Sequence, residues 1–252
     1  MTRGGKPVTG HPFRLTTEYV DSSGGHDHFA DRRNVNFTRE NYGHFILTRT
    51  NGHIDRPYQG ETQLNGIEEF HYAASIWGDS MRIKIESTQL PKLLNDSVTI
   101  AERVPDLELL PERDSYVRVG GTDEHRGPPD FIEDRNHYGT ATLIEDVTAI
   151  ADSFAVEYEN HRLRINDMSL PFGGAFDING NWEQDVIEPN CRQPGFGHCG
   201  HRRGQNADIS FQLINPRGQQ VVMTGRQRLL LLQIITLIAG APYQHSSHLH
   251  VQ

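Results

Sequence analysis

Two short stretches of the sequence combine residue types that bind metal ions. The first, GHRRGQNAD, contains a histidine and an aspartate seven positions apart, His201 and Asp208. The second, near the C-terminus, contains the spaced histidines His245, His248 and His250. Imidazole nitrogens and a carboxylate oxygen are ligands that zinc accepts, and three protein ligands leave a fourth position for water. We therefore predict a catalytic zinc ion (Zn2+) held by His201, Asp208 and His250.

The chemistry expected of such a centre is hydrolysis of an amide bond. A bound zinc ion lowers the pKa of its water to about 7 and polarises a carbonyl group. Strand alternation places His248 on the same face as His250, so His248 is predicted to act as general base or as an imidazolium donor. His245 is predicted to orient His248 or to bind substrate. The predicted catalytic residues are therefore His248 and His245.

Other residues of the sequence invite weaker hypotheses about sites. His26 and His28 are interpreted as part of a surface loop rather than a second metal site, because no third ligand is identifiable. The segment 177–181 resembles a calcium-binding loop poorly, since its glycine comes too early and the closing glutamate is missing. We expect His137 and Tyr138 to line the substrate cleft.

Charge and composition limit the function classes. The 252 residues include 24 Lys+Arg against 33 Asp+Glu, and this net charge of -9 argues against nucleic acid as the main partner. The apolar run 229–241 is shorter than the ~20 residues that span a bilayer, so it predicts a buried helix. Cys191 and Cys199 either form a disulfide, which would imply an oxidising compartment, or stay as two free thiols. The first residues lack the apolar core of a signal peptide, which suggests either a cytoplasmic chain or a piece of a longer secreted one.

The N-terminal half has the pattern of a β domain. Apolar and polar residues alternate over 13–19 and 81–86, and turn dipeptides such as Asn65-Gly66 separate the strand candidates. We predict a flexible tail at 1–10 and an antiparallel β-sandwich at 11–104. Four prolines and many charges over 105–135 predict a linker along the surface.

The C-terminal half, residues 136–252, mixes helices and strands. Apolar residues recur at three- and four-residue steps over 143–158, which predicts an amphipathic helix capped by Thr140 or Thr142. A second helix is predicted over 224–239, stopped by Gly240 and Pro242. Strands are predicted at 163–165, 207–213 and 248–251. The whole chain is therefore expected to be of the α+β class.

The residues of the two stretches resemble the LAS group of zinc metallopeptidases. This group includes lysostaphin-type endopeptidases, D-alanyl-D-alanine carboxypeptidases and the amino-terminal domain of hedgehog proteins. The chain is similar in particular to the penicillin-insensitive murein endopeptidases, with which it shares the loop DMSLPFGG at 167–174 and the spaced histidines at the end. The resemblance covers about residues 136–252. The chain differs from those enzymes in two respects. Its segment 175–200 is longer, and its first 104 residues look like a bacterial immunoglobulin-like repeat.

The resemblance carries its own expectations. It implies a small α+β peptidase domain with a central antiparallel sheet and two main helices, and zinc on His201, Asp208 and His250. It implies that His248 is catalytic, with His245 beside it. The implied substrate is a peptide cross-link of bacterial peptidoglycan, which places the protein outside the cell or in the periplasm. Two alternatives stay open: a zinc-stabilised binding or adhesion module without catalysis, and a structural surface repeat with incidental histidines.

Overall fold

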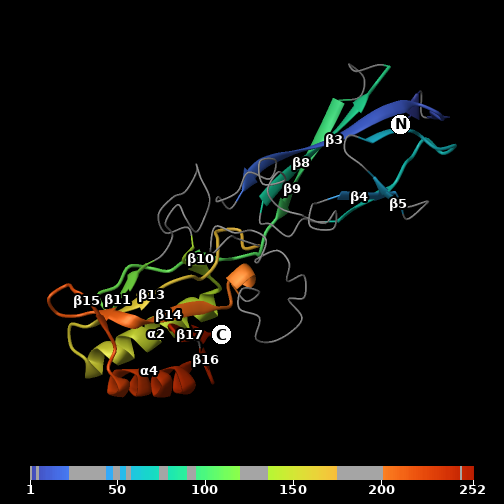
Figure 1. The fold of residues 1–252 in the computed structure, drawn as a ribbon. Helices are drawn as coiled ribbons and strands as arrows, with labels where there is room; N and C mark the ends of the chain where they lie inside the picture. Colours follow the sequence, from blue (N-terminus) through green and yellow to red (C-terminus); the bar gives the residue numbers. More distant parts are fainter. Residues whose placement is uncertain are drawn as a thin grey trace. The chain divides into compact units, whose positions relative to one another are not determined.

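The fold divides into two compact units. A computed structural model describes residues 2–3, 6–22, 44–47, 52–54, 58–73, 79–89, 95–119, 136–174, 201–244 and 246–252 (Figure 1). For these residues, the first unit ends at Arg103 and the second begins at Val104. Both α-helices of the described residues lie in the second unit, and neither is long and apolar enough to cross a bilayer.

The first unit consists of antiparallel sheets. Four strands form one sheet in the order β6 (Tyr58–Glu61), β3 (Pro12–Ser22), β8 (Asp79–Ser87) and β9 (Asn95–Glu102). Three strands form another in the order β5 (Gly52–Ile54), β4 (His44–Leu47) and β7 (Phe70–Ala73). The predicted antiparallel strands are thus confirmed, whereas the immunoglobulin-like sandwich stays a prediction. The expected flexible tail contains a two-stranded pairing of β1 (Thr2–Arg3) with β2 (Lys6–Pro7).

The second unit is built on a sheet of six strands. Its order is β11 (Tyr116–Arg118), β13 (Arg162–Ile165), β14 (Ala207–Ile214), β17 (His248–Val251) and β16 (Tyr243–Gln244), with β15 (Gln220–Val222) also paired to β14. The predicted strands at 163–165, 207–213 and 248–251 are confirmed as β13, β14 and β17. The expected antiparallel sheet holds for all pairs except one, because β11 runs parallel to β13.

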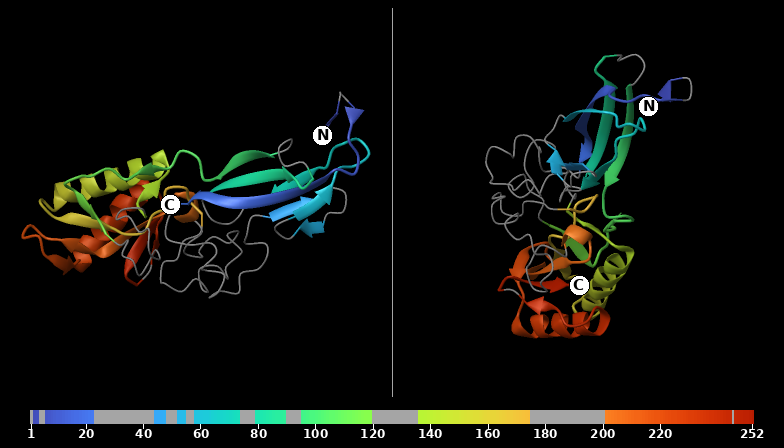
Figure 2. Two further views of the ribbon diagram at one scale, coloured as in Figure 1. Left: turned by 90° about the horizontal axis from the view of Figure 1, so that it is seen from above. Right: turned by 90° about the vertical axis from the view of Figure 1, so that its right-hand side faces the viewer.

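Two helices complete this unit. Helix α2 (Ala141–Glu157) begins at Thr140, whose Oγ1 accepts the backbone N–H of Leu143 at 3.3 Å. Helix α4 (Gly225–Ile238) begins at Thr224, which forms a capping box with Gln227. Both helices and the first of the two predicted caps are confirmed. Figure 2 gives two further views of the helices and the sheet.

Alternation along the strands gives the six-stranded sheet two different faces. The apolar face, defined by Ile209, Phe211, Leu213, Leu249 and Val251, is buried in one core with the inner sides of α2 and α4. The polar face, defined by Asp208, Ser210, Gln212, His248 and His250, points the other way because successive side chains of a strand alternate. The helices therefore cover the apolar face of the sheet and not the polar face.

The predicted surface linker at 105–135 needs correction in its described part. Residues 105–119 contain β11 and β10 (Glu108–Leu109), which pairs with β12 (Tyr138–Gly139). Leu110 and Tyr116 belong to the core of the second unit. The prolines at 105 and 111 flank these short strands and do not interrupt them, so a proline-rich composition is compatible with an integral part of the domain.

Candidate metal centre

Asp208 and His250 are brought together by strand pairing. They are direct partners in the antiparallel register of β14 and β17, so their side chains stand next to each other on the polar face. His250 Nδ1 lies 2.6 Å from Asp208 Oδ1. Both residues are almost completely buried, with 4% and 3% of their surface exposed.

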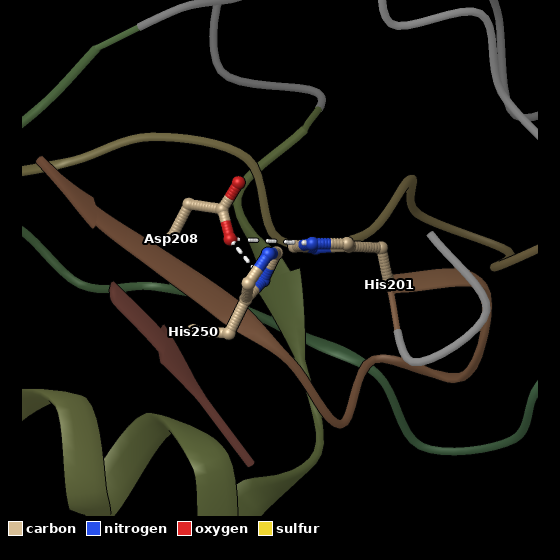
Figure 3. A group of neighbouring side chains, drawn as sticks. All are labelled: His201, Asp208 and His250. Carbon is tan, nitrogen blue, oxygen red and sulfur yellow. Dashed lines mark ion pairs between the residues drawn. The ribbon is translucent and has the colours of Figure 1, made fainter. Parts of the chain in front are cut away.

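His201 reaches the same carboxylate from a different element. It opens the short 3-10 helix η3 (His201–Arg203), and its Nδ1 lies 2.8 Å from the backbone oxygen of Met168. A carbonyl oxygen can only accept, so Nδ1 carries the hydrogen and Nε2 faces Asp208 Oδ1, at 3.4 Å. Figure 3 shows the two imidazoles converging on Asp208. Outer partners of this kind fix the tautomer and orientation of metal-binding histidines.

The turn after His201 depends on a glycine. Gly204 has a φ of +66°, and a Cβ at this position would lie 2.3 Å from Leu107 Cδ2 and 3.3 Å from the backbone of Gly139. Its N–H donates to the oxygen of His201, while its own oxygen accepts the N–H of Thr140. A residue with a side chain would be strained here, so Gly204 fixes the direction in which His201 enters the site.

The three residues fit a metal ion in donor type and spacing. One ligand atom from each of His201, Asp208 and His250 lies within 4.8 Å of the others. Two ligands about 2.0–2.1 Å from a tetrahedral zinc ion are about 3.3 Å apart. The separation of 3.4 Å between His201 and Asp208 matches this edge, whereas the 2.6 Å between His250 and Asp208 must open slightly. This buried group could hold a metal ion.

The electrostatics of the group favour a positive charge at its centre. Burial by itself would raise the pKa of the Asp208 carboxyl, but His201 and His250 outweigh burial and hold that pKa well below its usual range. Burial alone would lower the pKa of His201, but the Asp208 carboxylate, with smaller contributions from Asp167 and Met168, raises it above 6.5. The Asp208 carboxyl is therefore held in its charged form, and the protonated form of His201 is favoured beside it.

His248 stands beside the three candidate ligands. Its Nε2 lies 3.5 Å from Asp208 Oδ2 and 3.3 Å from His250 Nε2, and its Nδ1 is 2.9 Å from Ser247 Oγ. Its side chain is 23% exposed, in contrast to the buried ligands. The structure thus places His248 between the candidate metal site and solvent. His245 lies outside the described residues.

A loop that the sequence marked only through the family resemblance frames both Asp208 and His201. The N–H of Asn166 donates to the oxygen of Asp208, and the N–H of Asp208 donates to the oxygen of Asp167. Asp167 is itself buried, and Asn136 Nδ2 donates to its Oδ1 at 3.0 Å. No pattern in the sequence pointed to Asn136. The motif at 167–174 was informative, but its role in supporting the ligands becomes clear only from these hydrogen bonds.

His137 and Tyr138 were predicted to line the substrate cleft. His137 is completely buried, and its Nε2 lies 3.2 Å from the backbone oxygen of Ile165, so it does not line an open cleft. Tyr138 belongs to β12 and exchanges backbone hydrogen bonds with Ser169. The predictions for the cysteines at 191 and 199, the histidines at 26 and 28 and the segment 177–181 fall outside the described residues.

In comparisons with models of known protein families and with curated protein sequences, the chain matches none of them.

Proposed function

We propose that the second unit is a zinc-dependent hydrolase that cleaves an amide bond in a peptide. The observation that carries this proposal is the buried group of His201, Asp208 and His250, with His248 set against it. Two histidines and one carboxylate are a frequent ligand set of catalytic zinc sites. Candidate ligands from the 3-10 helix η3 and from two strands meet at one point, which favours a built site over a chance grouping of histidines.

The residues of the chain would divide the work. His201, Asp208 and His250 would hold the ion, and a zinc ion there would supply an activated water and polarise the carbonyl to be attacked. Two hydrogen bonds would keep His201 in place: its Nδ1 bonds to the backbone oxygen of Met168, and its backbone oxygen accepts the N–H of Gly204. The buried ligands would keep solvent away from the reacting groups, where charges interact more strongly than in water.

His248 would move the proton. Its Nε2 faces Asp208 and His250, so it can take a proton from the attacking water or donate one to the developing oxyanion. The nearby Ser247 hydroxyl would bond to Nδ1 and so hold the ring with Nε2 toward the centre. General acid–base catalysis of this kind contributes about 10²–10⁴-fold to rate.

The substrate proposal rests on the sequence resemblance. A cross-link peptide of bacterial peptidoglycan is the substrate implied by the shared motifs, and an extracellular or periplasmic location would follow. The first unit would be an immunoglobulin-like sandwich that holds the enzyme near its target. Its strands are antiparallel, as such a sandwich requires.

A second candidate function is a binding module that zinc stabilises without catalysis. The observation in its favour is that all three candidate ligands are buried, with exposed fractions of 0%, 4% and 3%. Structural zinc sites are closed in this way, whereas catalytic sites keep one position for water. The partly exposed His248 favours the enzyme, because it gives the centre a side that solvent can reach.

The two functions are separated by measuring metal content and turnover on one sample. Mass spectrometry of protein refolded with zinc should give one equivalent per chain, and fragments of peptidoglycan should then be cleaved. One equivalent of zinc with no cleavage of these fragments or of a peptide library would favour the binding module. A wild-type protein that binds no zinc would contradict both functions.

A further inference from the structure

A half-buried arginine shares the polar face with the candidate metal centre. Arg164 lies on β13 between Leu163 and Ile165, whose side chains are in the core, so its own side chain points to the opposite face. Arg164 Nη1 donates to Oε1 of Gln212 on the neighbouring strand β14. Gln212 belongs to the polar face, as do Asp208 and His250.

An irregularity in the pairing of β13 with β14 lies at this point. Leu163 pairs with Leu213 but Ile165 pairs with Ile209, so β14 contains two additional residues between these pairs. Ser210 Oγ accepts the N–H of Gln212 at 3.1 Å within the irregular stretch. Bulges are frequent beside active sites, where they redirect side chains. Here the irregular stretch begins after Ile209, next to Asp208, and contains Gln212, which contacts Arg164.

Arg164 is a partly buried cation, and its partner among the described side chains is neutral. Among the residues that the structure describes, its side-chain hydrogen bond goes to the neutral amide of Gln212, and no carboxylate forms an ion pair with it. Burial lowers the pKa of its guanidinium below the ordinary value. A partly buried cation without a counter-ion costs free energy, which an anionic ligand would recover.

We propose that Arg164 binds a carboxylate group of the substrate while the metal centre holds the bond to be cleaved. This proposal rests on the proposed function and makes the substrate more specific: an extended peptide with a free carboxylate at a fixed distance from that bond. The guanidinium still has donors beyond the one given to Gln212, and its planar fork suits a carboxylate.

Strand geometry limits the distance between the two subsites. Asn166 bonds to Asp208 through its backbone and is two residues from Arg164, or about 7 Å along β13. Along β14, Asp208 and Gln212 are four residues apart, or about 14 Å when the strand is fully extended. An extended peptide advances about 3.3–3.6 Å per residue. The carboxylate should therefore lie about two to four residues from the cleaved bond.

A series of molecular rulers tests this proposal. Each compound has a zinc-binding hydroxamate at one end, one to five alanine residues in L or D configuration, and either a carboxylate or a carboxamide at the other end. Affinity for the zinc-loaded protein is measured by isothermal titration calorimetry. With two to four alanines, we expect the carboxylate to bind about tenfold or more tightly than the carboxamide, as a charge-assisted hydrogen bond would give.

Variants show whether Arg164 is responsible. Arg164→Gln should abolish the preference for carboxylate, and Arg164→Lys, which keeps the charge, should retain part of it. The control is Arg226→Gln, which removes the same charge from an exposed site at the start of α4 and should leave the preference unchanged. Circular dichroism checks that each variant is folded.

The possible outcomes are distinct. If acetohydroxamate alone does not bind the zinc-loaded protein, the metal centre and this inference are both wrong. If acetohydroxamate binds but no spacer length gives an advantage to the carboxylate, the metal centre stands and Arg164 serves only the cross-strand contact with Gln212. A preference that persists in folded Arg164→Gln would also overturn the proposal.

Discussion

The two faces of the six-stranded sheet are made by alternate residues of the same strands, yet they serve different ends. On β14, Ile209 lies in the core under the helices, while its neighbour Asp208 takes part in the candidate metal centre. On β17, Leu249 is buried among apolar side chains, while His248 and His250 face Asp208. The apolar face fixes the positions of the strands, and the polar face holds the candidate metal ligands at those positions.

This division predicts that stability and metal binding can be separated by substitutions at adjacent positions. A rigid scaffold holds ligands to within the small tolerance that a metal site requires. The apolar face should therefore affect metal binding only through folding. Substitutions on the polar face should change metal affinity or turnover while the fold is kept.

The largest effect is expected for Asp208→Ala. Asp208 contacts His201, His248 and His250, so its loss removes both a ligand and the charge that attracts a cation. We expect the loss of zinc affinity to exceed the roughly 10–100-fold that follows loss of an outer partner. Zinc at about 100 times its Kd stabilises a folded protein by about 2.7 kcal/mol, which raises its Tm. This zinc-dependent increase in Tm should be absent in the variant. A zinc-dependent shift that persists would show that Asp208 is not a ligand.

His248→Ala should reduce turnover by about 10²–10⁴-fold, the range of a general acid or base. Zinc content should stay at one equivalent, because the three ligands are retained. His161→Ala, a change of the same type beyond the end of α2, should leave both quantities unchanged. Kinetics with peptidoglycan fragments and metal analysis of the same samples check the prediction, and full turnover by His248→Ala would contradict the role of His248.

Ile209→Ala tests the other face. Ile209 is completely buried in the core, and Ile→Ala changes at such positions cost about 2–5 kcal/mol. Urea unfolding should show this loss, while the fraction that stays folded should still bind one equivalent of zinc. Val222→Ala on β15 is the control, because Val222 is 62% exposed and should change stability by less than about 0.5 kcal/mol. If folded Ile209→Ala lost its zinc, the two faces would not be independent.

The sequence was most informative where one periodic pattern decides the structure. Alternation around His248 and His250 correctly predicted β17 and a shared face for the two histidines. The apolar spacing of α2 was also predicted correctly, and Thr140 is one of the two caps that were predicted, since both features depend on residues close in the chain. Local patterns of this kind define elements and the directions of their side chains.

Contacts between distant segments could not be predicted in this way. Nothing in the local sequence shows that β11 pairs in parallel with β13, or that residues 105–119 belong to the second unit. Met168 and Asn136 support the site through hydrogen bonds to His201 and Asp167, which lie 33 and 31 positions away in the sequence. His137 was predicted to line the substrate cleft, yet its side chain is completely buried.

A smaller effect is expected for Asp167→Asn, behind the polar face. Asn136 can still donate to the new amide oxygen, so the substitution removes mainly the negative charge that acts on His201. We expect zinc affinity to fall by about tenfold, at the lower end of outer-partner effects. Asp152→Asn, the same change at a half-exposed position on α2, should leave affinity unchanged. Competition with a chelating dye measures both, and equal affinities for Asp167→Asn and wild type would contradict this role.

The smallest effect, and the one that links charge to the metal, is the pH dependence of stability. The raised pKa of His201 contributes to the free energy of unfolding. This contribution is complete below about pH 6.5 and is lost as pH rises through the pKa of His201 in the folded state. The lowered pKa of Asp208 gives a second contribution to stability, which is present above about pH 3.8 and is lost as pH falls through the pKa of Asp208 in the folded state. Without metal, the pair should therefore stabilise the fold most between about pH 4 and 6.5.

Above about pH 6.5, bound zinc should reverse the loss of stability that is expected without metal. Zinc must displace the proton on His201, so its affinity increases with pH. The difference in Tm between samples with zinc and with a chelator should therefore grow from pH 6 to pH 8, while Tm in the chelator changes little or falls. Asp208→Ala should show no such difference at any pH, which separates the site from general effects of pH on the fold. A difference in Tm that shrinks as pH rises would mean that the proton and the metal ion do not compete for His201.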